Sequence, residues 1–157
     1  MSSANIFHYF KTKDEIIIDS TAYCMAKVED DFMKNAPKDF DDIKRFLKDI
    51  PYWTAEKHGK KYRFMYQVYT SPKYRKYGTE FFAGVRERYT EYSKSLEPKL
   101  GIPWQAILPL IYMFVRASVH YALFEDEEYL KPQLELIDKI LPLLAEKYSA
   151  APGGKTE

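Results

Sequence analysis

The chain is predicted to fold as an all-α protein built around one core. Apolar side chains recur every three or four residues along most of its length, and capping residues, prolines and glycines mark the limits of these periodic segments. No segment alternates apolar and polar residues as a half-buried strand does. The 157 residues are 46% hydrophobic, which is enough to form the core of one domain of this length.

The first predicted helix begins after Thr12. Thr12 stands three residues before Glu15, the capping-box spacing in which a hydroxyl and a carboxylate satisfy exposed amide groups at a helix start. Apolar residues then recur at helical spacing as far as Phe32, and Pro37 interrupts them. We therefore expect a long amphipathic helix between Thr12 and Pro37.

Two shorter helices are predicted next. Asp39 is a suitable cap for the first, and Pro51 is expected to end it because proline lacks a backbone donor and restricts the residue before it. A loop is expected through Gly59, followed by a helix of roughly ten residues that stops before Pro72. This second helix carries three tyrosines on one side, Tyr62, Tyr66 and Tyr69.

The clearest periodicity lies beyond Pro72 and predicts a long amphipathic helix. Its apolar side chains are Tyr74, Tyr77, Phe81, Val85, Tyr89, Tyr92 and Leu96. Gly101 suits the C-terminal cap of this helix, and Pro103 suits the first turn of the next one. The last two helices are expected at about Trp104 to Phe124 and Pro132 to Tyr148, and each carries apolar residues on two faces.

Composition excludes several classes of protein. The 24 basic and 23 acidic residues leave a net charge of +1, so no global field attracts the chain to nucleic acid or membrane. The single cysteine cannot form an internal disulfide, and the N-terminus lacks a secretory signal. The apolar run at residues 106–115 is too short to span a bilayer. We therefore expect a cytoplasmic protein without a membrane partner.

No catalytic or metal-binding motif is present. The chain has three histidines and one cysteine, and it contains no HExxH pair, glycine-rich phosphate loop, GxSxG elbow or cysteine set suited to a metal. The sequence therefore predicts a protein that is not an enzyme, with no catalytic residue, no metal and no cofactor.

The N-terminal stretch SSANIFHYFKTKDEII, residues 2–17, crowds three large apolar side chains, Ile6, Phe7 and Phe10, into five positions with nothing before them to cover them. It resembles the recognition helix and following helix start of the TetR family of transcriptional regulators. The matching residues are Ser2, Ser3, Asn5, Ile6, Phe7, His8, Tyr9, Phe10, Lys13 and Ile16. Phe7 departs from the family pattern, which usually has tyrosine there.

The resemblance implies a division of the chain. Residues 1–12 are a remnant of a helix-turn-helix DNA-binding domain, residues 13–148 form an effector-binding and dimerisation domain, and residues 149–157 are a disordered tail. Of the three helices in the family's DNA-binding domain, this sequence carries only the third. Either coding sequence lies upstream of Met1 or the protein has lost its DNA-reading unit, and we do not expect the remnant alone to bind DNA.

The remnant nevertheless carries residues suited to DNA. Its outward side presents short hydrogen-bonding groups that reach base edges or phosphates, and two lysines flank the capped start of the next helix. The predicted DNA-binding residues are Ser2, Ser3, Asn5, His8, Tyr9, Lys11 and Lys13. The alternative is a surface turn with ordinary polar residues.

In the family, the last two helices pair with their twofold mates in a four-helix bundle. The double apolar faces of the last two helices agree with this, because a helix that touches both its own core and a partner subunit needs two apolar stripes. The predicted homodimer interface is Leu108, Ile111, Val115, Val119, Leu134, Ile137, Leu141 and Leu144. The alternative is a monomer in which both stripes are internal.

Aromatic residues make up 17% of the chain, with 14 tyrosines, and are candidates to line a cavity for an aromatic or apolar small-molecule effector. The predicted ligand-binding residues are Trp53, Tyr62, Tyr66, Tyr69, Phe81, Tyr89, Tyr112, Arg116 and His120. Alternatively, the rings are core packing, and Arg116 pairs with a carboxylate from residues 125–128.

The function predicted from the resemblance is a ligand-responsive transcriptional regulator of TetR type, expected to be a repressor. Operator DNA is a partner where the helix-turn-helix is complete. The alternative is a dimeric helical protein that binds a small molecule or a partner and has no DNA role.

Overall fold

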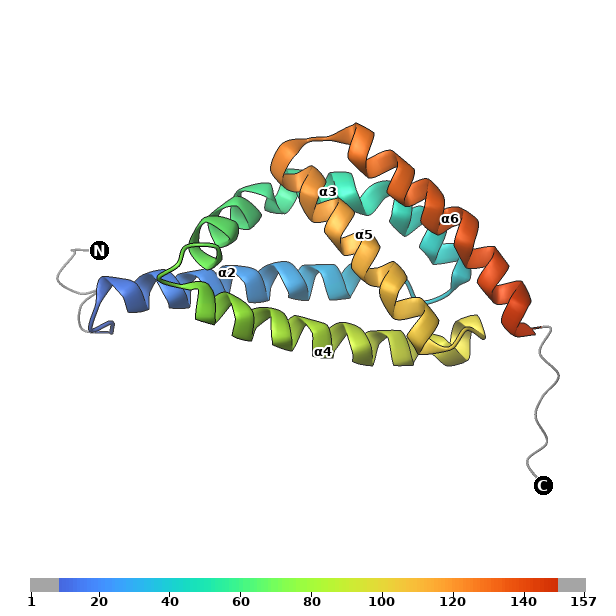
Figure 1. Ribbon diagram of the computed structural model, residues 1–157, viewed down its shortest axis with the longest axis horizontal. Coiled ribbons are helices and arrows are strands. Elements are labelled where there is room, and N and C mark those ends of the chain that lie inside the picture. The colour runs from blue at the N-terminus through green and yellow to red at the C-terminus, as the bar shows by residue number, and fades with distance from the viewer. Residues whose placement is uncertain (1–8, 150–157) are drawn as a thin grey trace, which may run out of the picture.

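The computed structural model describes residues 9–149 of the chain (Figure 1). In this range the chain forms five α-helices, α2 (Lys13–Asn35), α3 (Phe40–Tyr69), α4 (Arg75–Leu100), α5 (Trp104–Phe124) and α6 (Glu127–Ser149). No residue from 9 to 149 is in a strand. The predicted all-α class is therefore confirmed.

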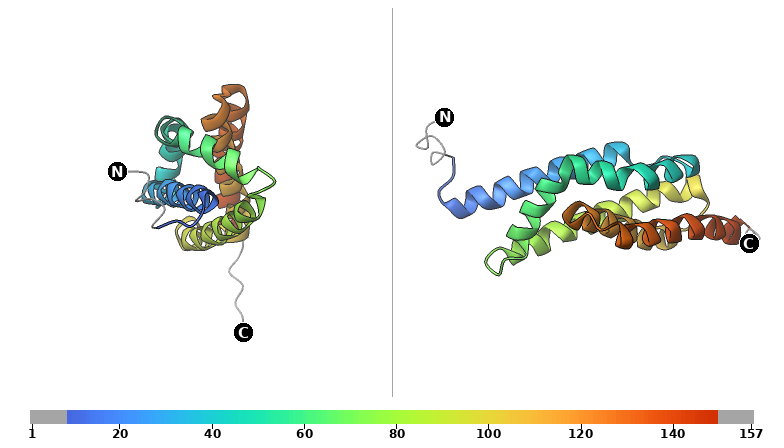
Figure 2. Two further views of the ribbon diagram at one scale, coloured as in Figure 1. Left: turned by 90° about the vertical axis from the view of Figure 1, so that its left-hand side faces the viewer. Right: turned by 90° about the horizontal axis from the view of Figure 1, so that it is seen from above.

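The helices are arranged around α5. In Figure 1, α2 and α4 run along the length of the molecule, and α5 crosses it obliquely. Helix α5 packs against α3, α4 and α6, and α3 also packs against α2 and α4. The first turn of α2 and the last turn of α6 lie at opposite ends of the molecule (Figures 1 and 2).

Local capping chemistry sets two helix starts as predicted. The Thr12 hydroxyl accepts a hydrogen bond from the Glu15 backbone N–H at 3.1 Å, and the Glu15 carboxylate accepts one from the Lys11 backbone N–H at 2.6 Å. At the start of α3, the Asp39 carboxylate accepts a hydrogen bond from the Asp42 backbone N–H at 2.9 Å. Both caps satisfy amide groups that have no partner inside the helix.

Helix α4 also ends as predicted, at a glycine cap. Gly101 has φ 65°, in the left-handed region that glycine adopts without strain, and its N–H donates to the Glu97 carbonyl at 2.9 Å. The predicted period along α4 is reflected in its burial, since Val85, Tyr89 and Leu96 are all buried.

The predicted break between residues 51 and 59 is wrong. Helix α3 runs without interruption from Phe40 to Tyr69, with Pro51 inside it, and it changes direction along its length (Figure 2). Pro51, Thr54, His58 and Gly59 are all buried. Tertiary packing of this segment therefore outweighs the hydrogen bond that proline removes.

The predicted start of the last helix is also wrong. Helix α6 begins at Glu127 rather than Pro132, because the Asp126 carboxylate accepts a hydrogen bond from the Tyr129 backbone N–H at 3.0 Å and Leu130 is completely buried. The helix continues through Ser149, the first residue of the predicted tail. The rest of that tail, residues 150–157, lies outside the described residues.

Two clusters of buried side chains form the core. One joins α2, α3, α4, α5 and α6, and includes Phe46, Tyr89, Phe114 and Ile137. The other joins α2, the second half of α3 and the second half of α5, and is centred on Met25, Met65 and Val119. Phe81 and Val115 pack against both clusters.

Among the described residues, α5 is a helix long and apolar enough to cross a membrane by length and composition alone. That pattern is weak evidence for a span, because core helices of soluble proteins share it. Helix α5 contacts three other helices of the bundle and carries six buried residues. Its packing is that of a core helix.

Candidate functional site

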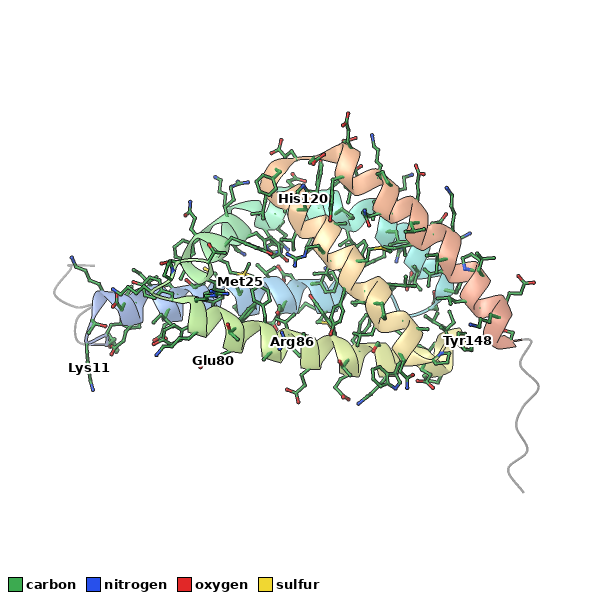
Figure 3. All side chains as sticks on the ribbon, in the orientation of Figure 1. Lys11, Met25, Glu80, Arg86, His120 and Tyr148 are labelled. Carbon is green, nitrogen blue, oxygen red and sulfur yellow. The ribbon has the colours of Figure 1, made fainter. Side chains whose placement is uncertain are left out.

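A cavity of about 400 Å³ lies where the two core clusters meet. Four helices line it, and each contributes side chains that recur along one side of the helix at intervals of one turn. The lining residues are Met25 and Glu29 of α2, Tyr62, Met65 and Tyr66 of α3, Phe81, Phe82, Val85, Arg86 and Tyr89 of α4, and Tyr112, Val115, Arg116 and Val119 of α5. Figure 3 labels Met25 on α2 and Arg86 on α4.

The fold brings together six of the nine residues predicted to bind a ligand. These are Tyr62, Tyr66, Phe81, Tyr89, Tyr112 and Arg116. They come from three helices that are separated in the sequence, so their common location is a result of tertiary packing. A cavity of this size with mostly apolar walls and a few polar groups is typical of small-molecule sites.

Trp53, Tyr69 and His120 do not line this cavity. The Trp53 ring packs edge-on against His58 at 5.2 Å between centroids. Tyr69 packs against Phe81 and lines an adjoining hollow of about 310 Å³. The His120 Nε2 lies 3.2 Å from an Asp126 oxygen, near the turn between α5 and α6 (Figure 3).

Sequence reasoning missed the contribution of α2. Met25 and Glu29 stand one helical turn apart and form one wall of the cavity. Met25 continues the apolar line of α2, so its inward position was recognisable. Glu29 was not recognisable, because it precedes Asp30 and Asp31 in what reads as a solvated acidic run.

Glu29 is a carboxylate held inside the protein. Its side chain is only 13% exposed and forms an ion pair with Arg88 of α4. Burial raises the pKa of Glu29 above its ordinary value, and the neighbouring Arg88 charge opposes this shift without reversing it. The charge of Glu29 is therefore largely compensated before any ligand enters.

Two tyrosine hydroxyls add neutral polar groups to the cavity wall. Tyr62 and Tyr89 are buried, and burial is the main cause that raises the pKa of both phenols above the ordinary value. Both remain protonated at neutral pH. Neither hydroxyl forms a hydrogen bond within residues 9–149, so both are available to a bound molecule or to water.

The guanidinium groups of Arg86 and Arg116 are the other charged groups of the lining. Within residues 9–149, neither side chain forms an ion pair or a hydrogen bond. The predicted alternative, in which Arg116 pairs with a carboxylate of residues 125–128, is therefore not found. Both arginines are exposed at the side of the cavity that opens to solvent.

The residues predicted to form a dimer interface divide into two groups. Val119, Ile137 and Leu141 are buried within the chain's own core, and Val115 lines the cavity, so none of these four presents a free surface to a partner. The others, Leu108, Ile111, Leu134 and Leu144, are half-buried against the core. Val119, Ile137 and Leu141 therefore belong to stripes that face the chain's own core, and the dimer interface itself stays a prediction.

A different apolar stripe of α6 faces outward. Leu136 is 45% exposed and Leu143 is 63% exposed, with the half-buried Ile140 between them. These residues are spaced by four and three positions and therefore share one face of the helix. Phe124, at the end of α5, is 68% exposed.

Four of the residues predicted to bind DNA, Ser2, Ser3, Asn5 and His8, lie outside the described residues. Tyr9, Lys11 and Lys13 are exposed. The first turn of α2 is hydrogen-bonded to the turn before α4. Asp14 accepts hydrogen bonds from the Lys73 ammonium and the Tyr74 hydroxyl, each at 2.7 Å.

Comparison of the chain with models of protein families, with curated proteins and with solved structures finds no match. The resemblance to the TetR family therefore rests on residues 2–17. Within residues 9–149, no group of three or more histidine, cysteine, aspartate or glutamate side chains is placed to hold a metal ion.

Proposed function

We propose that the protein is a ligand-responsive transcriptional regulator of TetR type, in which residues 13–149 bind the effector and dimerise. The observation that carries the proposal is the cavity of about 400 Å³ lined by α2, α3, α4 and α5 in an all-helical domain. The resemblance of residues 2–17 to a recognition helix supplies the DNA-reading role. We also propose that the protein is cytoplasmic.

Helix α2 provides the route from effector to DNA. Met25 and Glu29 belong to the cavity wall, and α2 leads back from them to Lys13 and the recognition segment. Met25 stands twelve residues after Lys13 in α2, which corresponds to a length of about 18 Å along the helix. A ligand that displaces the wall at Met25 moves the start of α2, because a helix transmits motion along its axis.

Regulation would then depend on spacing. In a twofold dimer, each recognition helix enters a major groove about 34 Å from its mate. A ligand that binds one arrangement of α2 better than another shifts the population of dimers that fit both half-sites. Repression is relieved when the favoured spacing no longer matches DNA.

The alternative function is a dimeric helical protein that binds a small molecule or a partner and has no DNA role. It is supported by the fact that the cavity and the outward stripe of α6 both lie within residues 13–149. Neither feature requires the recognition segment.

Selection from a pool of random DNA duplexes separates the two functions. The protein translated from the complete reading frame is mixed with the pool, and bound duplexes are recovered and sequenced. A regulator enriches inverted repeats whose half-sites lie one helical turn apart or a multiple of it. If no sequence is recovered above the level of a bead-only control, the regulator function is contradicted. The result would then favour the helical binding protein without a DNA role.

A further inference from the structure

The charges around the cavity are not balanced. Its lining contains one acidic side chain, Glu29, and two basic ones, Arg86 and Arg116. Glu29 already has Arg88 as its ion-pair partner. Within residues 9–149, Arg86 and Arg116 have no acidic partner, so two positive charges face the cavity without compensation.

A cationic ligand is the competing reading, because a buried carboxylate among aromatic rings attracts cations. The environment of Glu29 argues against it. Its carboxylate is already bound by the Arg88 guanidinium, so its negative charge is largely compensated. A cation entering the cavity would meet two guanidinium groups and displace a third from its partner.

The positive character continues beyond the cavity. The adjoining hollow shares Met65, Tyr66, Phe82 and Arg86 with it and adds Arg75. Within the described part of the chain, Arg75 also makes no ion pair. An anion in this hollow therefore lies beside the guanidinium groups of Arg75 and Arg86.

We propose that the cavity selects an organic carboxylate with an aromatic body, an inference that rests on the proposed effector site and names its ligand class. The carboxylate is held by Arg86 and Arg116 at the open side. The aromatic body lies against Tyr62, Met65 and Phe81. Guanidinium forks bind carboxylates with two parallel hydrogen bonds, and stacked or edge-on ring contacts orient a flat ligand.

Three probes with the same ring system test the charge preference. They are naphthalene-2-carboxylate, 2-naphthylmethanol and 2-naphthylmethylammonium, and saturation-transfer NMR titrations give the dissociation constant of each with the intact protein. We expect the carboxylate to bind at least about tenfold more tightly than the alcohol, and the ammonium more weakly than the alcohol, because only the carboxylate offers arginine an opposite charge and two acceptor oxygens.

Arginine variants assign the interaction to the cavity. Arg86→Gln and Arg116→Gln are each expected to weaken naphthoate binding by about three- to tenfold, and the double variant to bring it to the level of the alcohol. Arg45→Gln is the matched control, because Arg45 is 75% exposed, pairs with Asp42 and lies outside the cavity lining. It should leave all three constants unchanged.

A cavity-filling variant separates failure of this inference from failure of the proposed function. Val115→Phe fills space in the lining and should weaken the binding of any probe that occupies the cavity. If the alcohol or the ammonium binds best and Val115→Phe abolishes that binding, the cavity is an effector site and the carboxylate preference is wrong. If Val115→Phe, shown by circular dichroism to be folded, alters no probe, the effector site itself is wrong. Preferential naphthoate binding that survives the double arginine variant overturns the assignment to Arg86 and Arg116.

Discussion

His58 is a buried titratable residue. Its imidazole is 1% exposed and lies between charged side chains. Its Nδ1 is 3.2 Å from the Lys61 ammonium. Its Nε2 is 3.3 Å from an Asp31 oxygen, although the two atoms do not meet hydrogen-bond geometry. Burial is the main cause that lowers the pKa of His58, and Lys61 adds to the shift, while Asp31 opposes it.

Stability is predicted to fall as the pH drops below about 6.5, the ordinary pKa of histidine. Since the pKa of His58 is lowered in the folded state, the unfolded chain binds more protons in this window, and the free energy of unfolding decreases with acidification. The loss begins near pH 6.5 and levels off below the folded-state pKa. Urea unfolding measured at half-unit steps from pH 7.5 to 5 tests this.

The contribution of His58 is isolated by comparison with His58→Gln. The difference in unfolding free energy between the native protein and this variant should change with pH over the same window and be constant above it. A difference that is independent of pH would contradict the prediction, since carboxylates that do not contact His58 contribute equally to both proteins.

The roles of residues that form hydrogen bonds close by in the sequence were predictable. The roles of residues that pair with a side chain on another helix were not. Thr12, Asp39 and Gly101 bond to residues three or four positions away, so the spacing alone identifies them. Glu29 is a site residue only because Arg88, on another helix, folds against it. No pattern within one helix reveals such a pair.

At the scale of elements, α4 contains two glycines with opposite surroundings. A Cβ added to Gly78 would lie 2.7 Å from the Tyr69 Cβ and 3.2 Å from the Tyr69 carbonyl oxygen. A Cβ added to Gly84 would meet nothing nearer than the Arg88 Nη1 at 3.8 Å. Gly78 therefore allows the start of α4 to approach the end of α3, and Gly84 has no such role.

Gly78→Ala is predicted to lower the free energy of unfolding by about 1–3 kcal/mol, because the clash with Tyr69 forces α3 and α4 apart. Gly84→Ala is predicted to raise it by about 0.5–1 kcal/mol, since alanine favours a helix interior. Chemical denaturation of both variants measures the two effects. A stabilised Gly78→Ala protein would show that the contact between α3 and α4 relaxes without cost.

Helix α3 shows why element boundaries were predicted less well than element existence. Proline and glycine are strong local signals for a break, and both occur in the segment 51–59. Yet a Cβ on Gly59 would lie only 3.1 Å from the Ala122 carbonyl oxygen of α5, so this glycine allows two helices to approach closely. The same residue type marks a turn in one setting and a helix contact in the other.

At the scale of the whole molecule, hydrophobic periodicity predicted the all-α class and the existence of a second apolar face. It did not predict which face is turned inward. On α6, the stripe containing Ile137 and Leu141 and the stripe containing Leu136 and Leu143 have equal apolar character in the sequence. Packing against α5 selects the first for the core.

The cavity was predictable only in part for the same reason. Rings at helical spacing on α3 and α4 were identified, and the fold places most of them around one space. The wall from α2 and the paired charges of Glu29 and Arg88 depend on how α2 lies against the other helices. Sequence spacing carries no information on that arrangement.

The proposed dimer is expected to use the outward stripe of α6. Leu143→Glu places a charge on this stripe, and burial of an unpaired charge at an interface is strongly unfavourable. Because Leu143 is 63% exposed in the single chain, the substitution should leave the protomer folded and weaken dimerisation at least about tenfold. Sedimentation velocity over a range of protein concentrations measures the change.

Tyr23→Glu is the matched control, since Tyr23 is 66% exposed and lies on α2, away from α6. It should leave the association of the protein unchanged. If the native protein sediments as a monomer at micromolar concentration, or if Leu143→Glu and Tyr23→Glu weaken the dimer equally, the outward stripe of α6 is not the interface. Selective loss of the dimer in Leu143→Glu would instead orient the two protomers, because a twofold axis must then pass beside α6 and fix the separation of the two α2 helices.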